Sequence, residues 1–175
     1  MDRRQKKTRQ AIFDSFRELL ESNRYESITV QDIIDKADVG RSTFYSHFET
    51  KDMLLKAICS DIFEHVFKGE LCDYPGENRS LEEKLAHILW HLKSHKKDIT
   101  GLLSCESAEL FVGYIEAYLK ELFILHLGEL RKDVPEDFLL THLTGSFIAV
   151  LKWCVKKKMD ISPEEIARDF MKLVM

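Results

Sequence analysis

The stretch VGRSTFYSHFETKDML, residues 39–54, places many short polar side chains beside two aromatic rings. If the segment is helical, at about 100° per residue, Phe44 and Phe48 share one face, and Ser42 and Ser46 share the opposite face. Two rings four residues apart anchor such a helix in a core and leave its polar face for a contact outside the protein. The segment therefore predicts a short surface helix that presents hydrogen-bonding groups to a partner.

A second short helix is predicted directly before this segment. Thr29 is suited to be its N-cap, and Asp32 follows three residues later, as in a capping box. Ile33 and Ile34 belong to its inner face, and residues 38–40 then turn the chain. The two helices and this turn form a compact pair.

Longer helices are predicted on both sides of this pair. The first runs from about residue 6 to 22, where apolar residues recur at helical spacing, and Asn23, which tolerates a left-handed conformation, is expected to end it. The second starts near Thr50, with Asp52 in its first turn. This arrangement is a helix-turn-helix unit, in which the second short helix enters the major groove of DNA.

The charge of the chain is unevenly distributed. The net charge of −4 argues against general coating of nucleic acid, but residues 1–11 hold five Lys or Arg side chains and one Asp, a net charge of +4. A short basic run is also common at solvated termini. The basic run indicates nucleic-acid binding here only because the predicted polar helix accompanies it.

The composition predicts an all-α protein. Among 175 residues there are seven glycines and three prolines, no strand-like alternation stands out, and the pattern indicates about nine helices. Four widely spaced cysteines without a signal peptide before them indicate reduced thiols in a cytoplasmic protein. No apolar run approaches the roughly 20 residues that cross a bilayer, so we expect no membrane contact.

The stretch YESITVQDIIDKADVGRSTFYSHFETKDML, residues 25–54, resembles the DNA-binding domain of TetR-family (tetracycline-repressor-like) transcriptional regulators. The resemblance covers about residues 8–58 and implies a helix-turn-helix domain at 1–58, followed by a helical ligand-binding and dimerisation domain at 59–175. The matching positions are Tyr25, Thr29, Val30, Ile33, Ala37, Val39, Thr43, Phe44, Tyr45, Phe48, Lys51 and Leu54.

The resemblance also implies which residues meet double-stranded DNA. An Arg side chain can bond bidentately to guanine, worth about 1–3 kcal/mol of discrimination, whereas hydroxyl groups and Lys hold phosphates without reading sequence. The base-reading residues that it implies are Gln31, Arg41, Ser42 and Ser46. The phosphate-contacting residues that it implies are Thr29, Thr43, Tyr45, His47 and Lys51.

Two turn residues depart from the family pattern. Asp38 stands where the family usually has Gly, at a position that needs a positive φ, and Gly40 stands where it often has Ser. Asp takes the left-handed conformation at some cost, and Gly is an acceptable N-cap. Because Asp38 also adds a negative charge near the expected phosphate path, we expect modest affinity for DNA.

A palindromic operator requires a two-fold symmetric protein, so we expect a homodimer. DFLLTHLTGSFIAVLKWCVKKK, residues 137–158, is apolar nearly all round, which indicates a helix covered by its own core and by a partner, with the core of a monomer as the alternative. We expect this helix at about 134–157, capped by Asp133 with Glu136, and a last helix that starts at Ser162 and Pro163. The predicted interface residues are Thr141, Gly145, Ile148, Ala149, Lys152, Ile166, Phe170 and Leu173.

The part around GSFIAVLKW also resembles a TetR subgroup common in low-GC Gram-positive bacteria, whose last two helices form a four-helix dimer bundle. The family further implies an effector pocket among the middle helices, one of which begins with the capping box of Ser80 and Glu83. Aromatic residues at helical spacing are also ordinary core, so both interpretations stay open. The predicted pocket residues are Phe63, Phe67, His87, Trp90, His91, Phe111 and Tyr114.

The spacing of His87, His91 and His95 places three imidazoles on one helix face, a geometry that metal sites use. No Cys or carboxylate motif adjoins them, and half-buried histidines are common at such positions. We therefore expect no metal and no cofactor, and we read the ladder as structural.

Two functions remain after this reading. The first is a dimeric repressor released from DNA by a small-molecule effector, and the second is a TetR-like coactivator or protein-interaction regulator without a diffusible ligand. No Ser/His/Asp order, P-loop or H-E-x-x-H motif is found, so we do not expect an enzyme.

Overall fold

The computed structural model describes residues 3–68, 73–77, 79–95, 103, 108–130, 133–158 and 160–174, without the side chains of residues 61, 62, 64, 65, 67, 68 and 129. Within these ranges the chain forms eight α-helices, two short 3₁₀ helices and no strand. The prediction of an all-α fold is confirmed.

Contacts divide the chain into two compact units. One comprises residues 1–59 with 97–111, and the other comprises residues 60–96 with 112–175. The first break lies one residue after the boundary predicted at 58, and most of the segment 97–111 lies outside the described residues. Helix α4 (Lys51–Lys68) begins in the first unit and ends in the second.

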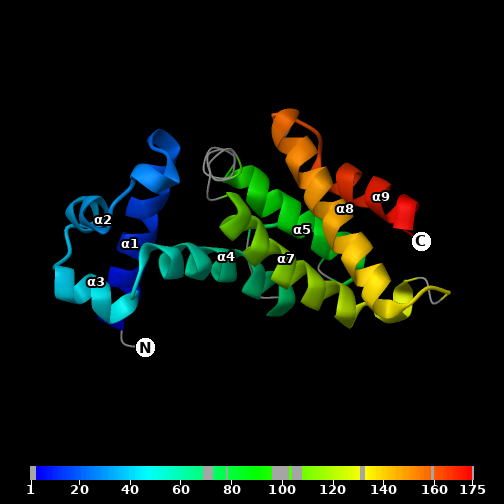
Figure 1. Cartoon of the computed structure of the whole chain (residues 1–175), viewed down its shortest axis with the longest axis horizontal. Helices are drawn as coiled ribbons and strands as arrows, with labels where there is room; N and C mark the ends of the chain where they lie inside the picture. The colour runs from blue at the N-terminus through cyan, green and yellow to red at the C-terminus, as the bar shows by residue number, and fades with distance from the viewer. Residues whose placement is uncertain are drawn as a thin grey trace. The chain divides into compact units, whose positions relative to one another are not determined.

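The first unit is built around α1, with α2 packed on it and α3 beside α2 (Figure 1). Its core is aromatic, because the ring centroids of Phe13 and Phe48 lie 5.7 Å apart and those of Phe44 and Phe48 lie 6.0 Å apart. The elements before α4 are α1 (Arg3–Ser22), the 3₁₀ helix η1 (Tyr25–Ser27), α2 (Val30–Ala37) and α3 (Arg41–His47).

The ends of α1 and α2 follow local hydrogen bonding. The capping box of α2 is confirmed, since Asp32 N donates to Thr29 Oγ1 at 3.2 Å and Thr29 N donates to Asp32 Oδ2 at 2.7 Å. Helix α1 ends before Asn23 as predicted, but Asn23 does not take a positive φ. Its Nδ2 donates to the carbonyl of Leu19 at 3.0 Å, so the side chain satisfies that carbonyl without a left-handed residue.

The turn between α2 and α3 does use a left-handed residue. Asp38 has φ 50° and ψ 50°, as the family pattern predicts, and its N–H reaches the carbonyls of Ile34 and Asp35. Gly40 is the N-cap of α3 with φ −71°, so it needs no special backbone freedom. The turn thus depends on one strained residue, Asp38.

Lys51 ties the loop before α2 to the start of α4. Its Nζ donates to the carbonyls of Tyr25 and Ile28, each at 2.7 Å, and lies 4.2 Å from the centre of the Tyr25 ring. The hydroxyl of Tyr25 in turn donates to Asp52. The ammonium group of Lys51, at the start of α4, therefore satisfies two carbonyls at η1, more than twenty residues earlier in the chain.

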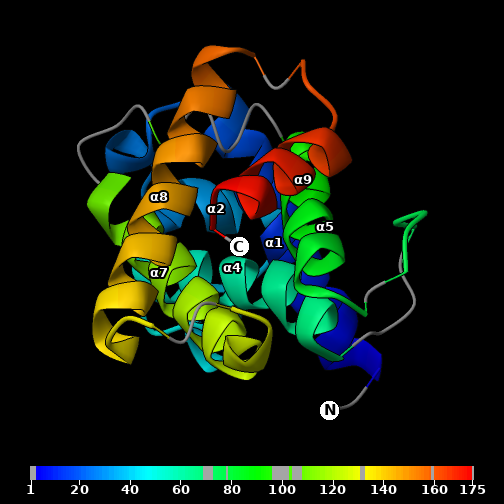
Figure 2. The same cartoon turned by 90° about the vertical axis from the view of Figure 1, so that its right-hand side faces the viewer.

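The second unit contains the end of α4 and four further α-helices among the described residues. Helix α9 lies along α5 (Figure 2), and the capping box of Ser80 and Glu83 at the start of α5 is confirmed. Two of the helices, α8 and α9, contact each other through Phe147 and Phe170, whose ring centroids lie 5.2 Å apart in an edge-to-face arrangement. The elements are α5 (Leu81–Ser94), α7 (Ala108–Leu125, whose residues 108–111 fall in the first unit), the 3₁₀ helix η2 (Leu127–Glu129), α8 (Glu136–Lys156) and α9 (Pro163–Val174).

The start of α8 differs from the prediction. Pro135 is its N-cap without a side-chain hydrogen bond, so the expected cap by Asp133 with Glu136 is wrong. The residue before a proline is disfavoured in helical conformation, which keeps Val134 out of the helix. At α9, by contrast, Glu165 N donates to Ser162 Oγ at 3.0 Å and Pro163 is the first helical residue, as predicted.

Helix α8 also corrects the expectation that no apolar run is long enough to cross a bilayer. By length and composition it passes that test, and it is the one helix to do so among the residues searched. Core helices pass the same test, and α8 buries eight residues inside the protomer, among them Leu143, Phe147 and Leu151. This packing explains part of its apolar character, because Phe138 and Trp153 of the same helix are 64% and 44% exposed.

The cysteines that the structure describes are inert. Cys59 and Cys154 are free and buried, and burial raises the pKa of Cys59 to about 12 and that of Cys154 to about 11. Both thiols therefore stay protonated at neutral pH. Cys72 and Cys105 lie outside the described residues.

The strain at Asp38 leads to a first prediction. Changing Asp38 to Gly should raise the free energy of unfolding by up to about 1 kcal/mol, because Gly adopts the left-handed region without a Cβ clash. Changing Asp38 to Val should lower it by about 1–2 kcal/mol, because a β-branched residue is poorly tolerated there. Urea denaturation of the three proteins measures both, and equal stability of the Gly and Val variants would contradict the assignment.

The contacts of Lys51 lead to a second prediction. Changing Lys51 to Ala should lower the free energy of unfolding by about 2 kcal/mol, because two part-buried carbonyls lose a charged donor. Lys56, an exposed residue on the same helix, is the matched control, and its change to Ala should be nearly neutral. Thermal denaturation of the two variants tests this prediction. Equal melting temperatures of the Lys51 and Lys56 variants would exclude a structural role for Lys51.

Candidate nucleic-acid interface

The orientation of α3 is set by two rings. Phe44 and Phe48 are buried, and Phe48 also meets Phe13 of α1, so one side of α3 is anchored in the core. The opposite side faces solvent, and Tyr45 keeps 46% of its surface exposed with its ring edge on Phe44. The predicted division into a buried aromatic side and an open polar side is confirmed for this helix.

The predicted contact residues of α3 lie on this open side. Arg41, Ser42 and Ser46 are exposed, and Thr43 and His47 are half-buried. The hydroxyl of Ser46 donates to the carbonyl of Thr43 at 2.7 Å, which directs its proton inward and leaves its oxygen as an acceptor. Their contacts with DNA stay predictions.

Gln31 of α2 joins this group through hydrogen bonds. Arg41 Nη2 donates to Gln31 Oε1 at 2.6 Å, and Gln31 Nε2 donates to Asp35 Oδ1 at 2.7 Å. Two predicted base-reading residues from different helices are therefore bonded to each other. Sequence spacing did not predict this pairing, because positions 31 and 41 are brought together only by the turn at Asp38.

Two predicted phosphate contacts already have partners within the protein. Thr29 Oγ1 donates to Asp32 Oδ2 at 2.6 Å, and this bond, with the one from the backbone N–H of Thr29, holds the pKa of Asp32 below its usual value. Lys51 donates to Tyr25 and Ile28, as described above. Contact of either residue with phosphate stays a prediction, with only part of its hydrogen-bonding capacity available.

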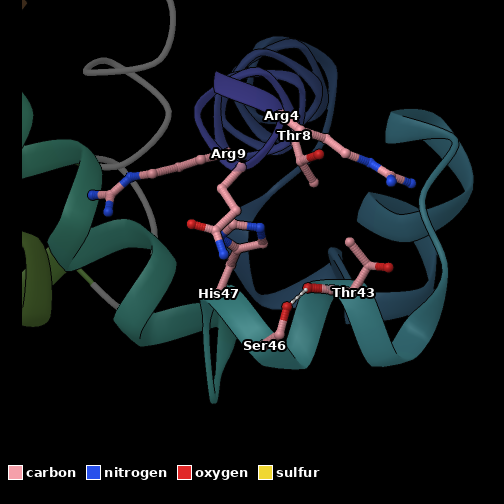
Figure 3. Close-up of a pocket in the computed structure, with 7 residues that line it drawn as sticks. Arg4, Thr8, Arg9, Thr43, Ser46 and His47 are labelled. Atoms are coloured by element: carbon pink, nitrogen blue, oxygen red, sulfur yellow. Dashed lines mark hydrogen bonds between the residues drawn. The ribbon is translucent and has the colours of Figure 1, made fainter. Parts of the chain in front are cut away.

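A cleft of about 480 Å³ lies between the beginning of α1 and α3 (Figure 3). The guanidinium of Arg9 lies 5.0 Å from the centre of the Phe13 ring and 5.6 Å from that of Phe48, so the rings that seat α3 also hold this cation. Its lining residues are Arg4, Gln5, Thr8, Arg9, Thr43, Ser46 and His47.

The lining residues from α1 were missed by sequence reasoning. The net charge of +4 in residues 1–11 was the available signal, but charge alone does not tell a solvated terminus from a binding surface. Arg4 and Arg9 of α1 line the cleft together with residues of α3, and their guanidinium groups extend to opposite sides in Figure 3. The cleft therefore combines two cationic side chains of α1 with polar side chains of α3.

The predicted effector-pocket residues are largely covered by protein. Phe63, His87 and Phe111 are each at most 2% exposed, and Phe63 stacks on Tyr118 with centroids 4.8 Å apart. Phe111 falls in the first compact unit, whereas the other predicted pocket residues fall in the second. The side chain of Phe67 lies outside the described residues, while Trp90 and Tyr114 are half-buried.

His87 and His91 form a close imidazole pair, with their Nε2 atoms 3.0 Å apart. The ring of Tyr74 stacks on His87 at 4.3 Å, and Trp90 meets His91 edge to face. Among the described residues no group of three or more His, Cys, Asp and Glu could hold a metal ion. His95 is the C-cap of α5, where its backbone N–H bonds to the carbonyl of His91.

The predicted dimer-interface residues separate into two sets. Ile148 of α8 is buried inside the protomer, and so are Ile166 and Phe170 of α9, the helix that packs on α5. Contact of these three residues with a partner stays a prediction. The periodicity of apolar residues predicts which face of a helix is covered, but it does not say which neighbouring element covers that face. Those that remain on the surface are Thr141, Gly145, Ala149, Lys152 and Leu173, the last 82% exposed.

Part of this surface is hollowed. Gly113 and Ala117 of α7 and Thr141 and Gly145 of α8 line a groove of about 420 Å³, with the charged side chains of Glu116 and Lys120 also in its lining. A Cβ added at either glycine would meet no atom within 4 Å. Another helix can therefore approach this part of the surface closely.

Both halves of the chain match family models. Residues 12–58 match "Bacterial regulatory proteins, tetR family", and residues 79–175 match "Transcriptional regulator C-terminal region". The uncharacterized HTH-type transcriptional regulator YxbF of Bacillus subtilis is 28% identical over 182 residues, which cover 99% of this chain and 46% of YxbF. The dhaKLM operon transcriptional activator DhaS of Lactococcus lactis is 32% identical over 74 residues, 42% of this chain and 40% of DhaS.

The alignments with these two curated relatives thus span less than half of the relatives' own lengths. Solved structures match over nearly the whole chain. A TetR transcriptional regulator from Streptococcus agalactiae has a TM-score of 0.75 and 39% identity, with 98% of this chain and 96% of that chain covered. With a helix-turn-helix unit seated as described and family models that match both halves, the chain belongs to the tetR family of bacterial transcriptional regulators and carries its helix-turn-helix DNA-binding domain.

Proposed function

We propose that the chain is a dimeric, sequence-specific regulator that reads a palindromic operator with α3. The observation that carries the proposal is the geometry of this helix, which is anchored by Phe44 and Phe48 and open on its polar side. Its domain of residues 1–58 would bind DNA, and residues 59–175 would dimerise and sense a signal. It would act in the cytoplasm, where bacterial DNA lies.

The cleft beside α3 supports the proposed mode of binding. Arg4 and Arg9 line it, and a phosphate held there would set the register of α3 without reading sequence. Arg41 would then bond bidentately to guanine in the major groove. The positive charge is local in a chain of net charge −4, so binding would use few phosphate contacts. Each contact would add about 0.9 to the slope of log K against log salt.

Dimerisation would place two α3 helices in successive major grooves, about 34 Å apart along the DNA. The exposed residues of α8 support the proposed pairing, since Gly145 and Ala149 are small and recur at helical spacing. Leu173 of α9, almost fully exposed, is an apolar residue that a partner would cover. A protomer alone would reach only half of a palindromic site.

The regulatory step would couple an effector to the spacing of the two α3 helices. A small molecule releases the protein from DNA only if it binds the DNA-incompetent arrangement better than the competent one. In this form the protein is a repressor, and its operator overlaps the promoter that it controls.

A second candidate is an activator or coactivator that works without a diffusible ligand. Two observations favour it. The relative DhaS is described as an activator, and the predicted pocket residues Phe63, His87 and Phe111 are already covered by protein. Transcription in vitro from a promoter with the selected operator separates the candidates, because a repressor lowers transcript yield and an activator raises it.

The direct test of DNA reading is selection from a library of randomised duplexes with the purified protein. Enrichment of a two-fold symmetric sequence supports the proposal, and retention of all duplexes in proportion to their input excludes it. Selection repeated against a panel of metabolites then identifies any effector through loss of the enriched sequence.

Arg41 and Arg4 should have separable effects on DNA binding. Changing Arg41 to Ala should lower the preference for the selected operator over a scrambled duplex by about 5- to 100-fold, because a base contact is lost. Changing Arg4 to Ala should weaken binding to both duplexes alike and reduce the slope of log K against log salt by about 0.9. Fluorescence anisotropy titrations at several salt concentrations measure both effects, and identical losses from the two changes would refute the assigned roles.

Gly145 offers a test of the dimer. Changing Gly145 to Arg should shift the protein to monomers, because a long side chain would block the approach of a partner helix. The protomer should remain folded, since no atom lies within 4 Å of an added Cβ. Changing Gly145 to Ala is the control and should leave the dimer intact. Sedimentation velocity and circular dichroism provide the measurements, and a dimeric Arg variant would place the interface elsewhere.

A further inference from the structure

A chain of two hydrogen bonds crosses from α2 to α3 on the proposed DNA-binding side. Arg41 Nη2 donates to Gln31 Oε1 at 2.6 Å, and Gln31 Nε2 donates to Asp35 Oδ1 at 2.7 Å. Gln31 and Asp35 are one turn apart on α2, and all three side chains are exposed. Asp35 was not among the residues that the family resemblance assigned to DNA.

The chemistry of the three groups fixes the direction of this chain. A guanidinium has only donors, and an ionised carboxylate has only acceptors. A side-chain amide has both, because its oxygen accepts and its NH₂ donates. If the amide of Gln31 were reversed, its oxygen would face the carboxylate of Asp35 and its NH₂ would face the guanidinium of Arg41. Only one amide orientation satisfies both neighbours, so Asp35 determines which atom of Gln31 meets Arg41.

We propose that Asp35 is a positioning residue for sequence reading, which acts on the bases through Gln31 and Arg41 without touching DNA. The proposal rests on the base-reading roles proposed for those two residues. Arg has one of the largest side-chain entropies, and a guanidinium that is already oriented in the free protein loses less of it on binding. Asp35 therefore favours the operator that this orientation fits.

The charge of Asp35 makes the proposal sharply testable. A carboxylate on the DNA-binding side repels phosphate, so its removal by electrostatics alone should tighten binding to every duplex equally. Loss of positioning should instead weaken binding to the operator relative to other duplexes. The ratio of the two dissociation constants separates these effects, because the uniform electrostatic contribution cancels in it.

The experiment compares Asp35→Ala with two controls on full-length protein. Asp38→Asn removes one negative charge from the same helix-turn-helix without altering the Gln31 contacts, and Asn tolerates the left-handed conformation of that position. Asp35→Asn removes the charge of Asp35 and keeps an oxygen that can accept from Gln31. The probes are the duplex selected by the wild-type protein and a scrambled duplex of the same composition.

We expect Asp35→Ala to lower the operator preference by about threefold to tenfold, a fraction of one bidentate base contact, with an unchanged salt slope. Asp38→Asn should tighten binding to both duplexes and leave their ratio unchanged, and Asp35→Asn should retain most of the preference. In the background of Arg41→Ala, the further change of Asp35 to Ala should no longer alter the ratio, because its effect passes through Arg41.

Several results would overturn the inference. One is an Asp35→Ala protein that, like Asp38→Asn, binds both duplexes more tightly in the same proportion. Another is an undiminished effect of Asp35→Ala when Arg41 is already Ala. Because Ala is a stronger helix former than Asp, the melting temperature of Asp35→Ala should not fall, and this measurement shows that the variant is folded. If the wild-type protein selects no sequence at all, the proposed function fails, and this inference fails with it.

Discussion

The contact of Phe44 and Phe48 with Phe13 is the constraint on which the rest of the first unit depends. These rings hold one side of α3 in the core, and the other side can therefore be polar without loss of stability. The same rings hold the guanidinium of Arg9 over their faces. The rings that orient α3 therefore also fix the position of one cation beside it.

The turn between α2 and α3 sets which polar side chains of the two helices meet. Asp38 accepts a left-handed conformation so that the chain can reverse within three residues, and that reversal brings Arg41 within 2.6 Å of Gln31. The result is a hydrogen-bonded pair from two helices, at the positions where we propose that bases are read. The strain at one backbone position and the hydrogen bonds at the surface are consequences of the same geometry, as is common where function requires an unusual conformation.

Residues that the family pattern marks for DNA also stabilise the fold. Thr29 caps α2 and lowers the pKa of Asp32, and Lys51 closes the loop that precedes α2. The structural contacts of Thr29 and Lys51 already give each a role in the fold, so the presence of either residue in the motif does not by itself identify a phosphate contact. In the second unit, burial of Ile166 and Phe170 against neighbouring helices likewise gives both residues a role in the core of the protomer.

The sequence by itself determined the all-α class, the helix-turn-helix unit, the capping boxes of α2 and α5, and the polar side of α3. Each of these depends on residues within a few positions of one another, where helical periodicity and local hydrogen bonds decide. Only the tertiary structure decided that Arg4 and Arg9 line a cleft with α3, that Lys51 bonds to distant carbonyls, and that Asp35 reaches Arg41 through Gln31. Those contacts join residues from separate elements, and periodicity contains no information about which elements pack together.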